Sequence, residues 1–169
     1  MLNDEITEAA INDPLIMKFG ESIFNKLRKQ HNANYIRQRM RQLARLLLAA
    51  KTVDEKIADI TTLLDPANFD TIVKCVQTMG NYDHATGTYG IVALPLKIGH
   101  NLRKCAGVLQ TFGLMSANNA IIEKSQHFIQ LMNNEYILVS SQAWTSAAHR
   151  KFNKPVYLPV TKDVKKLTE

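Results

Sequence analysis

Hydrophobic residues recur at helical spacing along most of this chain, and the pattern is cleanest in residues 34–51. The apolar side chains of that stretch fall three or four positions apart and so line one face of a helix: Ile36, Met40, Leu43 and Leu47. Asn34 is a residue type that often caps a helix start. The pattern therefore predicts a long amphipathic helix over residues 34–51, with Asn34 as its N-cap.

Similar patterns predict helices on both sides of this one. Asp13-Pro14 and Asp65-Pro66 each place a capping carboxylate before a proline, which is typical of a first helical turn. Apolar faces predict helices over residues 15–27, 54–64, 69–79, 94–115, 118–132 and 135–152, the last two being separate or joined by a kink. Phe24 and Leu27 are expected in the core, and Trp144 belongs to the apolar face of the last helix. Residues 4–11 form a weaker amphipathic segment.

Glycine interrupts the helical pattern in two places. Residues 80–90 contain three glycines and no hydrophobic period, so we expect an exposed loop there. Gly99, Gly107 and Gly113 lie within residues 94–115 and predict either close helix packing or a break near Gly113. Strand signals are almost lacking. The fold class is therefore predicted as all-α, an irregular bundle of seven or eight helices.

The length of 169 residues suits one domain with its own core. We expect a single helical domain over residues 1–160. Residues 161–169 read as the start of a linker or of a next-domain helix, as if the chain were the front part of something longer. Cys75 and Cys105 lie in apolar helical patterns and are expected to be buried thiols rather than a disulfide framework.

The charge balance narrows the expected partners. Lys and Arg number 21 against 15 Asp and Glu, a net charge of +6, which favours nucleic acid or another acidic surface without being specific. No apolar run approaches the ~18 residues of a membrane span, and the acidic N-terminus carries no signal-peptide pattern. These features indicate an intracellular protein with no membrane partner. They do not separate the nucleus from the cytosol, and a nuclear location is expected only together with DNA binding.

Two helical faces concentrate the positive charge. Arg37, Arg41 and Arg45 are four residues apart and form a band along the central helix, with Gln38 and Gln42 beside them. A second cluster lies within residues 94–115: Lys97, His100, Arg103 and Lys104. Both faces could contact phosphates, the glutamines could reach base edges, and the second cluster could equally be a solvated face.

Other basic groups have simpler explanations or no clear role. Lys26, Arg28, Lys29 and His31 end a predicted helix, where cations complement the helix dipole. A last set lies near the C-terminus: His149, Arg150, Lys151, Lys154, Lys162, Lys165 and Lys166. Histidine and cysteine spacing indicates no metal site, and neither a phosphate loop nor an acid–base constellation is visible. We expect no catalytic residues, cofactor or small-molecule substrate.

Four stretches carry a family resemblance: DPLIMKFGESIF, NYIRQRMRQLARLLLAAK, LPLKIGHNLRKCAGVL and RKFNKPVYLPVTKDVKKL. They resemble the N-terminal blocks of an animal protein family whose C-terminal region is similar to the tyrosine recombinases of Crypton-type transposons. That resemblance implies an enlarged helical core-binding domain that grips DNA. The recombinase catalytic set has no match here, since His149-Arg150 are adjacent rather than spaced as His-x-x-Arg, and Tyr157 lacks the context of the nucleophile.

Two functions follow as expectations. The first is a non-catalytic module of a transposon-derived, recombinase-like protein that binds double-stranded DNA through the two basic faces. The second is a helical protein-interaction or oligomerisation domain, including a homo-oligomer, in which the arginines pair with acidic groups of a partner. A stand-alone enzyme is the least supported class.

Overall fold

A computed structural model of the chain describes residues 4–27 and 32–155. In these residues it contains seven α-helices of eight residues or more, one four-residue helical turn and a two-stranded sheet, which confirms the all-α prediction. The helices are α1 (Glu5–Asn12), α2 (Pro14–Leu27), α3 (Ala33–Val53), α4 (Ile60–Leu63), α5 (Phe69–Met79), α6 (Ala93–Met115), α7 (Asn119–Asn134) and α8 (Tyr136–Phe152). The expectations for residues 161–169, and for Arg28, Lys29 and His31, lie outside the described residues.

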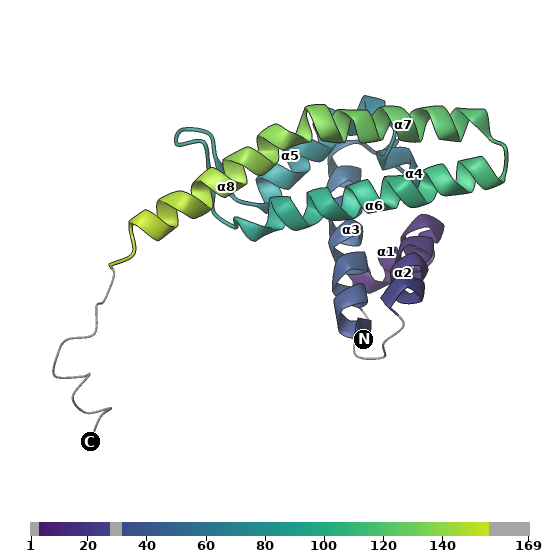
Figure 1. Cartoon of the computed structure of the whole chain (residues 1–169), viewed down its shortest axis with the longest axis horizontal. Helices are drawn as coiled ribbons and strands as arrows, with labels where there is room; N and C mark the ends of the chain where they lie inside the picture. The colour runs from purple at the N-terminus through teal and green to yellow at the C-terminus, as the bar shows by residue number, and fades with distance from the viewer. Residues whose placement is uncertain (1–3, 28–31, 156–169) are drawn as a thin grey trace, which may run out of the picture.

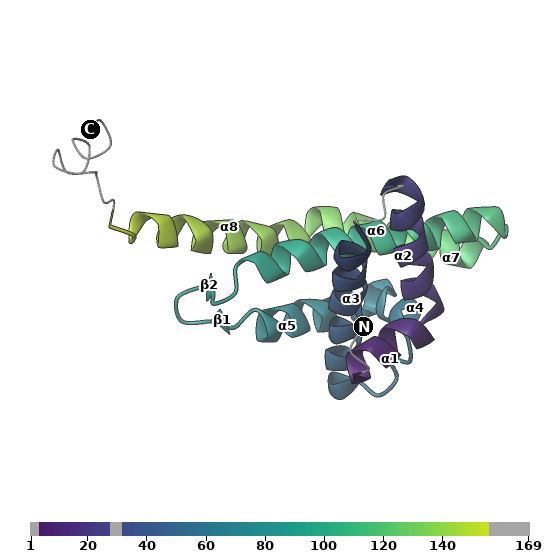
Figure 2. The same ribbon diagram turned by 90° about the horizontal axis from the view of Figure 1, so that it is seen from below.

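The longest helices form an elongated layer from which the N-terminal helices project. Helix α7 runs back along α6, and α8 continues onward past the start of α6 (Figure 1). Helices α1, α2 and α3 lie on one side of that layer, and α3 also contacts α5 (Figure 2). The buried apolar side chains form one cluster that extends from Ala10 in α1 to Ala143 in α8.

Asp13 caps the start of α2 and also contacts a distant segment. Its Oδ1 accepts hydrogen bonds from the backbone N–H groups of Leu15 and Ile16, both at 3.0 Å, as an N-cap does. Its Oδ2 accepts a third bond at 2.8 Å from the N–H of Ile60, at the start of α4. This buried carboxylate therefore caps α2 and ties it to a segment 47 residues away.

Several helix boundaries differ from the prediction. Helix α3 begins at Ala33, so the predicted N-cap role of Asn34 is wrong, and its side chain instead accepts a bond from Arg37 Nη1 at 3.4 Å. The predicted helix over residues 54–64 is reduced to α4, because Asp59 caps Thr62 N at 2.7 Å and starts the helix late. Helix α6 continues through Gly113 without a break.

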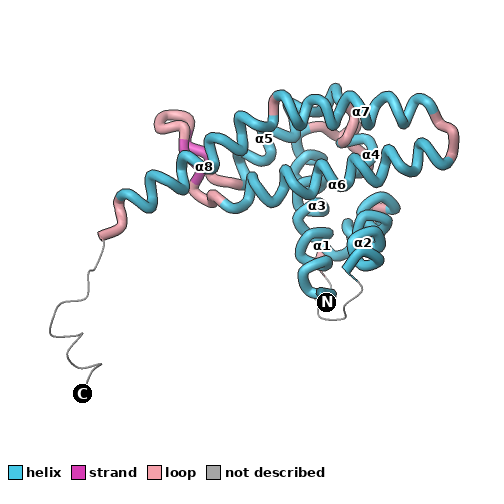
Figure 3. The backbone as a smooth tube through the Cα atoms, in the orientation of Figure 1, coloured by secondary structure: helices cyan, strands magenta, loops and turns pink. Residues whose placement is uncertain are grey.

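The predicted exposed loop at residues 80–90 is wrong in part. It contains a short antiparallel hairpin of β1 (Tyr82–Asp83) and β2 (Thr88–Tyr89), the one pair of strands in the described residues (Figure 3). Tyr89 is 2% exposed, and its N–H donates to Ser146 Oγ of α8 at 2.9 Å. Arg150 of α8 also donates to the carbonyls of Tyr89 and Gly90. The hairpin is thus anchored under α8.

Exposure corrects three further expectations and confirms others. Phe24 and Leu27 are exposed rather than in the core, and Trp144 is 64% exposed on α8. Both cysteines are free and buried, as predicted. Close packing at Gly99 is confirmed, because a Cβ there would collide with the Tyr136 ring, which is held by a 2.7 Å bond from its hydroxyl to Pro95 O.

Candidate functional site

The predicted arginine band on α3 is divided by its neighbours. Arg37 and Arg45 are exposed. Arg41 instead makes a bidentate ion pair with Asp4, its Nη1 and Nη2 lying 2.8 and 2.7 Å from the two carboxylate oxygens. Arg41 Nη1 also donates to Thr7 Oγ1 at 2.6 Å. These bonds hold α1 against α3, and the hydrogen bond from Arg41 holds the pKa of Asp4 well below its usual value.

Arg39 lies two residues earlier on the same helix and is more deeply buried than Arg41. It is only 5% exposed. Its Nε donates to Asn101 Oδ1 at 2.6 Å and its Nη1 to the Tyr35 hydroxyl at 3.1 Å, and the Phe19 ring lies 5.3 Å from the guanidinium carbon. Its Nη2 is buried without a hydrogen-bond partner. Among the described residues no carboxylate forms an ion pair with Arg39, so a full positive charge is buried uncompensated.

A small pocket of about 140 Å³ opens between α3 and α6 beside Arg39. We call it the narrow pocket. Gln38 and Gln42 line it from α3, and Lys97, His100 and Asn101 line it from α6. The fold therefore brings four of the predicted contact residues together: Gln38, Gln42, Lys97 and His100.

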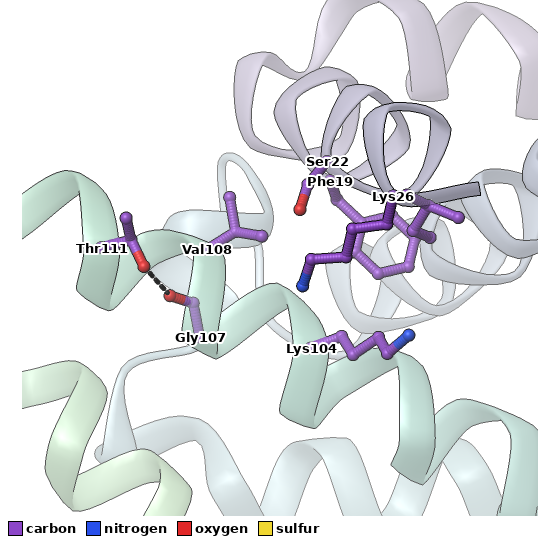
Figure 4. A pocket seen from close by; sticks show the side chains of 8 residues that line it. Phe19, Ser22, Lys26, Lys104, Gly107, Val108 and Thr111 are labelled. Carbon is purple, nitrogen blue, oxygen red and sulfur yellow. Dashed lines mark hydrogen bonds between the residues drawn. The ribbon is translucent and has the colours of Figure 1, made fainter. Parts of the chain in front are cut away.

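A larger pocket of about 470 Å³ lies between α2 and α6, and we call it the wide pocket. Figure 4 shows Lys26 and the Ser22 hydroxyl extending from α2 towards α6, beside the ring of Phe19. Lys104 and Gly107 line the side formed by α6. A Cβ at Gly107 would meet nothing within 4 Å, so this glycine leaves the wide pocket open along the helix.

The two pockets follow one another along the same side of α6. The residues that α6 contributes are spaced three or four apart, which places them in one row: Lys97, His100, Asn101, Lys104, Gly107, Val108 and Thr111. Among the described residues, none that lines either pocket is acidic. Five described basic residues from three helices lie in or beside the row, and we call them the basic cluster: Lys26, Arg39, Lys97, His100 and Lys104.

The electrostatics of the cluster are those of like charges held together. Partial burial, followed by the charges of Arg39 and Lys26, lowers the pKa of Lys104 below its usual value. Partial burial, followed by the charges of Arg39, Lys104 and Arg103, lowers the pKa of His100. Each additional positive charge is costly here, so an anion in either pocket would relieve the repulsion.

The remaining predicted basic residues lie elsewhere or have partners. Arg103 lies on another side of α6, where its Nη2 donates to Met132 O at 3.1 Å. In the described part of the tail, His149, Arg150 and Lys151 lie in the last turn of α8, at the end that projects past the other helices (Figure 1). The fold thus joins parts of the first two predicted clusters and separates the third.

The sequence interpretation missed two members of the basic cluster. Lys26 was explained by the helix dipole, and Arg39 was not considered. A signal for Arg39 was present, because it falls three residues after Ile36 and four before Leu43, on the buried face of α3. A charged residue at such a position needs an internal partner or a ligand.

Comparison with protein-family models, curated proteins and solved structures finds nothing that matches this chain. In residues 4–27 and 32–155, no helix is long and apolar enough to cross a membrane. The same residues contain no group of three or more His, Cys, Asp or Glu arranged to hold a metal ion. On the geometry of the two pockets, the candidate site is the basic row along α6.

Proposed function

We propose that this chain is a non-catalytic module that binds double-stranded DNA through its phosphate backbone. The observation that carries the proposal is the basic cluster, in which side chains from α2, α3 and α6 converge without an acidic residue among them. A fold that only needed solubility would keep these charges apart and in water, because partial burial and, after it, the neighbouring positive charges lower the pKa values of Lys104 and His100. A polyanion supplies the missing negative charge.

Binding would work by neutralising phosphates and releasing their counterions. Lys26, Lys97 and Lys104 would contact successive phosphates along α6, and the exposed Arg37 and Arg45 could extend the contact along α3. Gln38 is exposed and could reach a base edge. Gln42 is less able to do so, because its Oε1 accepts a bond from Asn101. We expect affinity that depends strongly on salt and weakly on sequence.

The resemblance to the N-terminal blocks of an animal protein family whose C-terminal region is similar to Crypton-type recombinases agrees with this proposal. A core-binding domain grips DNA with helices and leaves cutting to another domain, so a helical chain with a basic row and no recombinase catalytic set would suit that role. A nuclear location belongs to the same proposal.

Fluorescence anisotropy with a labelled random duplex tests the proposal. Binding should weaken steeply between about 50 and about 200 mM salt. The double variant Lys26→Gln/Lys104→Gln removes two charges from the row and should reduce the slope of log K against log salt by about 1.8, at ~0.9 for each phosphate contact.

The matched control is Lys51→Gln/Lys74→Gln, which removes the same charge from exposed positions of α3 and α5 that do not line either pocket. It should leave the slope nearly unchanged. Equal losses in the two double variants would mean that only net charge matters, and no binding at about 50 mM salt would reject the proposal.

A helical self-association domain is the second candidate. The observation in its favour is that Ile137 and Trp144, seven residues apart on α8, are 60% and 64% exposed. Size-exclusion chromatography with light scattering separates the two candidates. A dimer abolished by Trp144→Gln, together with no DNA binding, would favour self-association.

A further inference from the structure

We propose that the narrow pocket is a seat for a single phosphate group, held by the buried guanidinium of Arg39. The inference deepens the proposed function, on which it rests for the source of the phosphate. The seat itself is inferred independently, from the hydrogen-bond inventory around Arg39.

Arg39 fixes the orientation of the neighbouring amides. A guanidinium can only donate, so the atom of Asn101 that lies 2.6 Å from Arg39 Nε must be its carbonyl oxygen. Asn101 then presents its Nδ2 to Gln42 and donates to Gln42 Oε1 at 2.8 Å. The amide nitrogen of Gln42 is left as a donor without a partner in this chain of bonds.

The other acceptor close to Arg39, the Tyr35 hydroxyl oxygen, is also occupied. The Tyr35 hydroxyl oxygen accepts from Arg39 Nη1 at 3.1 Å, so its own hydrogen is available to donate. Lys97 contributes an ammonium group, which can only donate. The acceptors that Arg39 binds directly, and the Gln42 oxygen that it reaches through Asn101, are therefore occupied within the protein. The donor groups of Gln42, Tyr35 and Lys97 are left for a ligand.

The unpartnered atom is Nη2 of Arg39. The Arg39 side chain lines the pocket and is 5% exposed, and its buried Nη2 makes no hydrogen bond to the residues that the structure describes. Both partners of the guanidinium, Tyr35 and Asn101, also line the pocket. An orphaned charged donor of this kind is costly, and an acceptor with a negative charge removes the cost.

The size of the pocket is compatible with a small anion. Its volume of about 140 Å³ has room for several water-sized groups. A tetrahedral phosphate has five heavy atoms and several acceptor oxygens, which suits the donors of Arg39, Gln42, Tyr35 and Lys97. A phosphate of a nucleic-acid backbone and a terminal phosphate of a strand share this chemistry.

The test uses inorganic phosphate as the probe and thermal unfolding of the full chain as the readout. Phosphate replaces chloride at constant ionic strength, and we compare the wild type with Arg39→Met and with the control Lys51→Met. Lys51 is exposed on the same helix and does not line the pocket. The control is needed because phosphate stabilises most folded proteins by exclusion from their surfaces.

At a phosphate concentration about tenfold above Kd, the wild type and Lys51→Met should gain ~3 °C more than Arg39→Met. Equal gains in the three proteins would overturn the inference. If Arg39→Met does not fold, Gln38→Trp decides, since Gln38 is exposed and a bulky ring there would fill the pocket. It should remove the excess gain, and an unchanged gain would overturn the inference.

Duplexes with 5′-phosphate and 5′-hydroxyl ends identify the source. A terminal phosphate would give tighter binding of the phosphorylated duplex, by ~10-fold for one charge-assisted contact, and Arg39→Met would abolish the difference. A backbone phosphate would give equal binding of the two duplexes and weaker binding of both to Arg39→Met. Phosphate stabilisation without duplex binding would support the seat and reject the DNA module, whereas salt-dependent duplex binding without phosphate stabilisation would do the reverse.

Discussion

Two arginines on α3, separated by a single residue, are used in opposite ways. Arg41 faces α1 and has a carboxylate, because Asp4 binds both of its terminal nitrogens. Arg39 faces α6 and has none in the described residues, although it is the more buried of the two. On the side of α3 that faces α1, a carboxylate therefore neutralises the arginine charge. On the side that faces α6, positive charge is in excess.

The comparison shows why residue type alone does not identify a binding residue. A guanidinium with an internal carboxylate stabilises the packing of two helices, and its charge is no longer available to a ligand. A guanidinium bound only to neutral groups keeps its charge, so its site still favours an anion. Four predictions sharpen this difference, in order of decreasing expected effect.

Replacing Arg39 by Met should have the largest effect, and on binding rather than on the fold. The loss of one charge-assisted contact predicts an affinity for duplex DNA about 10- to 100-fold lower. Stability should change little, because removing an unpaired buried charge offsets the loss of the bond to Asn101. Anisotropy and thermal unfolding of the same preparation measure both. A variant that unfolds but binds normally when folded would reverse the roles of the two arginines.

The affinity of the row for DNA should rise as the pH falls. Partial burial and the charges of Arg39, Lys104 and Arg103 lower the pKa of His100 in the free protein, and a bound phosphate would raise it again. Between the pKa of His100 in the free protein and its pKa in the complex, binding takes up a proton. The affinity should therefore rise as the pH falls from about 8 to about 5.5, by at most ~10-fold for each unit by which binding shifts the pKa. Anisotropy across this range measures it. His100→Gln should flatten the profile, and an unchanged profile would remove His100 from the site.

Replacing Arg41 by Met should lower the thermal midpoint while leaving the DNA affinity within about twofold of the wild type. The reason is that α1 loses its ion pair with α3, while the row along α6 is untouched. Asp4→Asn should act in the same direction, and the double variant should be little worse than either single one, because both changes break the same contact. Additive losses would show that Arg41 and Asp4 act separately.

Acid should weaken the ion pair between Asp4 and Arg41 that holds α1 against α3. The pKa of Asp4 is depressed in the folded protein, so its contribution to stability is complete above the unfolded value of about 3.9 and is lost as the pH falls below it. Chemical unfolding from about pH 6 to about pH 2.5 should therefore show a smaller acid loss in Asp4→Asn than in the wild type. Equal acid losses would mean that the ion pair of Asp4 makes no measurable contribution to the acid sensitivity.

The local structure was largely predictable from sequence. The apolar spacing in residues 34–51 and the start signals at Asp13 and Asp65 correspond to α3, α2 and the turn before α5. Helix boundaries were less predictable, as Asn34 and residues 54–59 show, because a helix begins where a polar side chain caps its free N–H groups, and several candidate residues lie close together. The hairpin that buries Tyr89 was missed, since two-residue strands carry no periodic signal.

The candidate site was predictable only in part. Lys97, His100 and Lys104 could be placed on one face, because they lie on one helix at spacings of three and four. Their convergence with Lys26 and Arg39 could not, because those residues lie on α2 and α3, more than 50 positions earlier. The pairing of Arg41 with Asp4 was hidden for the same reason, at a separation of 37 residues.

By itself, then, the sequence determined the helical class, the positions of most helices and the excess of positive charge, because these depend on composition and on spacings within about one helical turn. The tertiary structure alone decided which arginine is paired and which is not. Ion pairs and pockets depend on distances of a few ångströms between atoms from different helices, and packing sets those distances. At Arg39, packing brought Tyr35, Phe19 and Asn101 to a buried positive charge, and no carboxylate of residues 4–27 and 32–155 forms an ion pair with it.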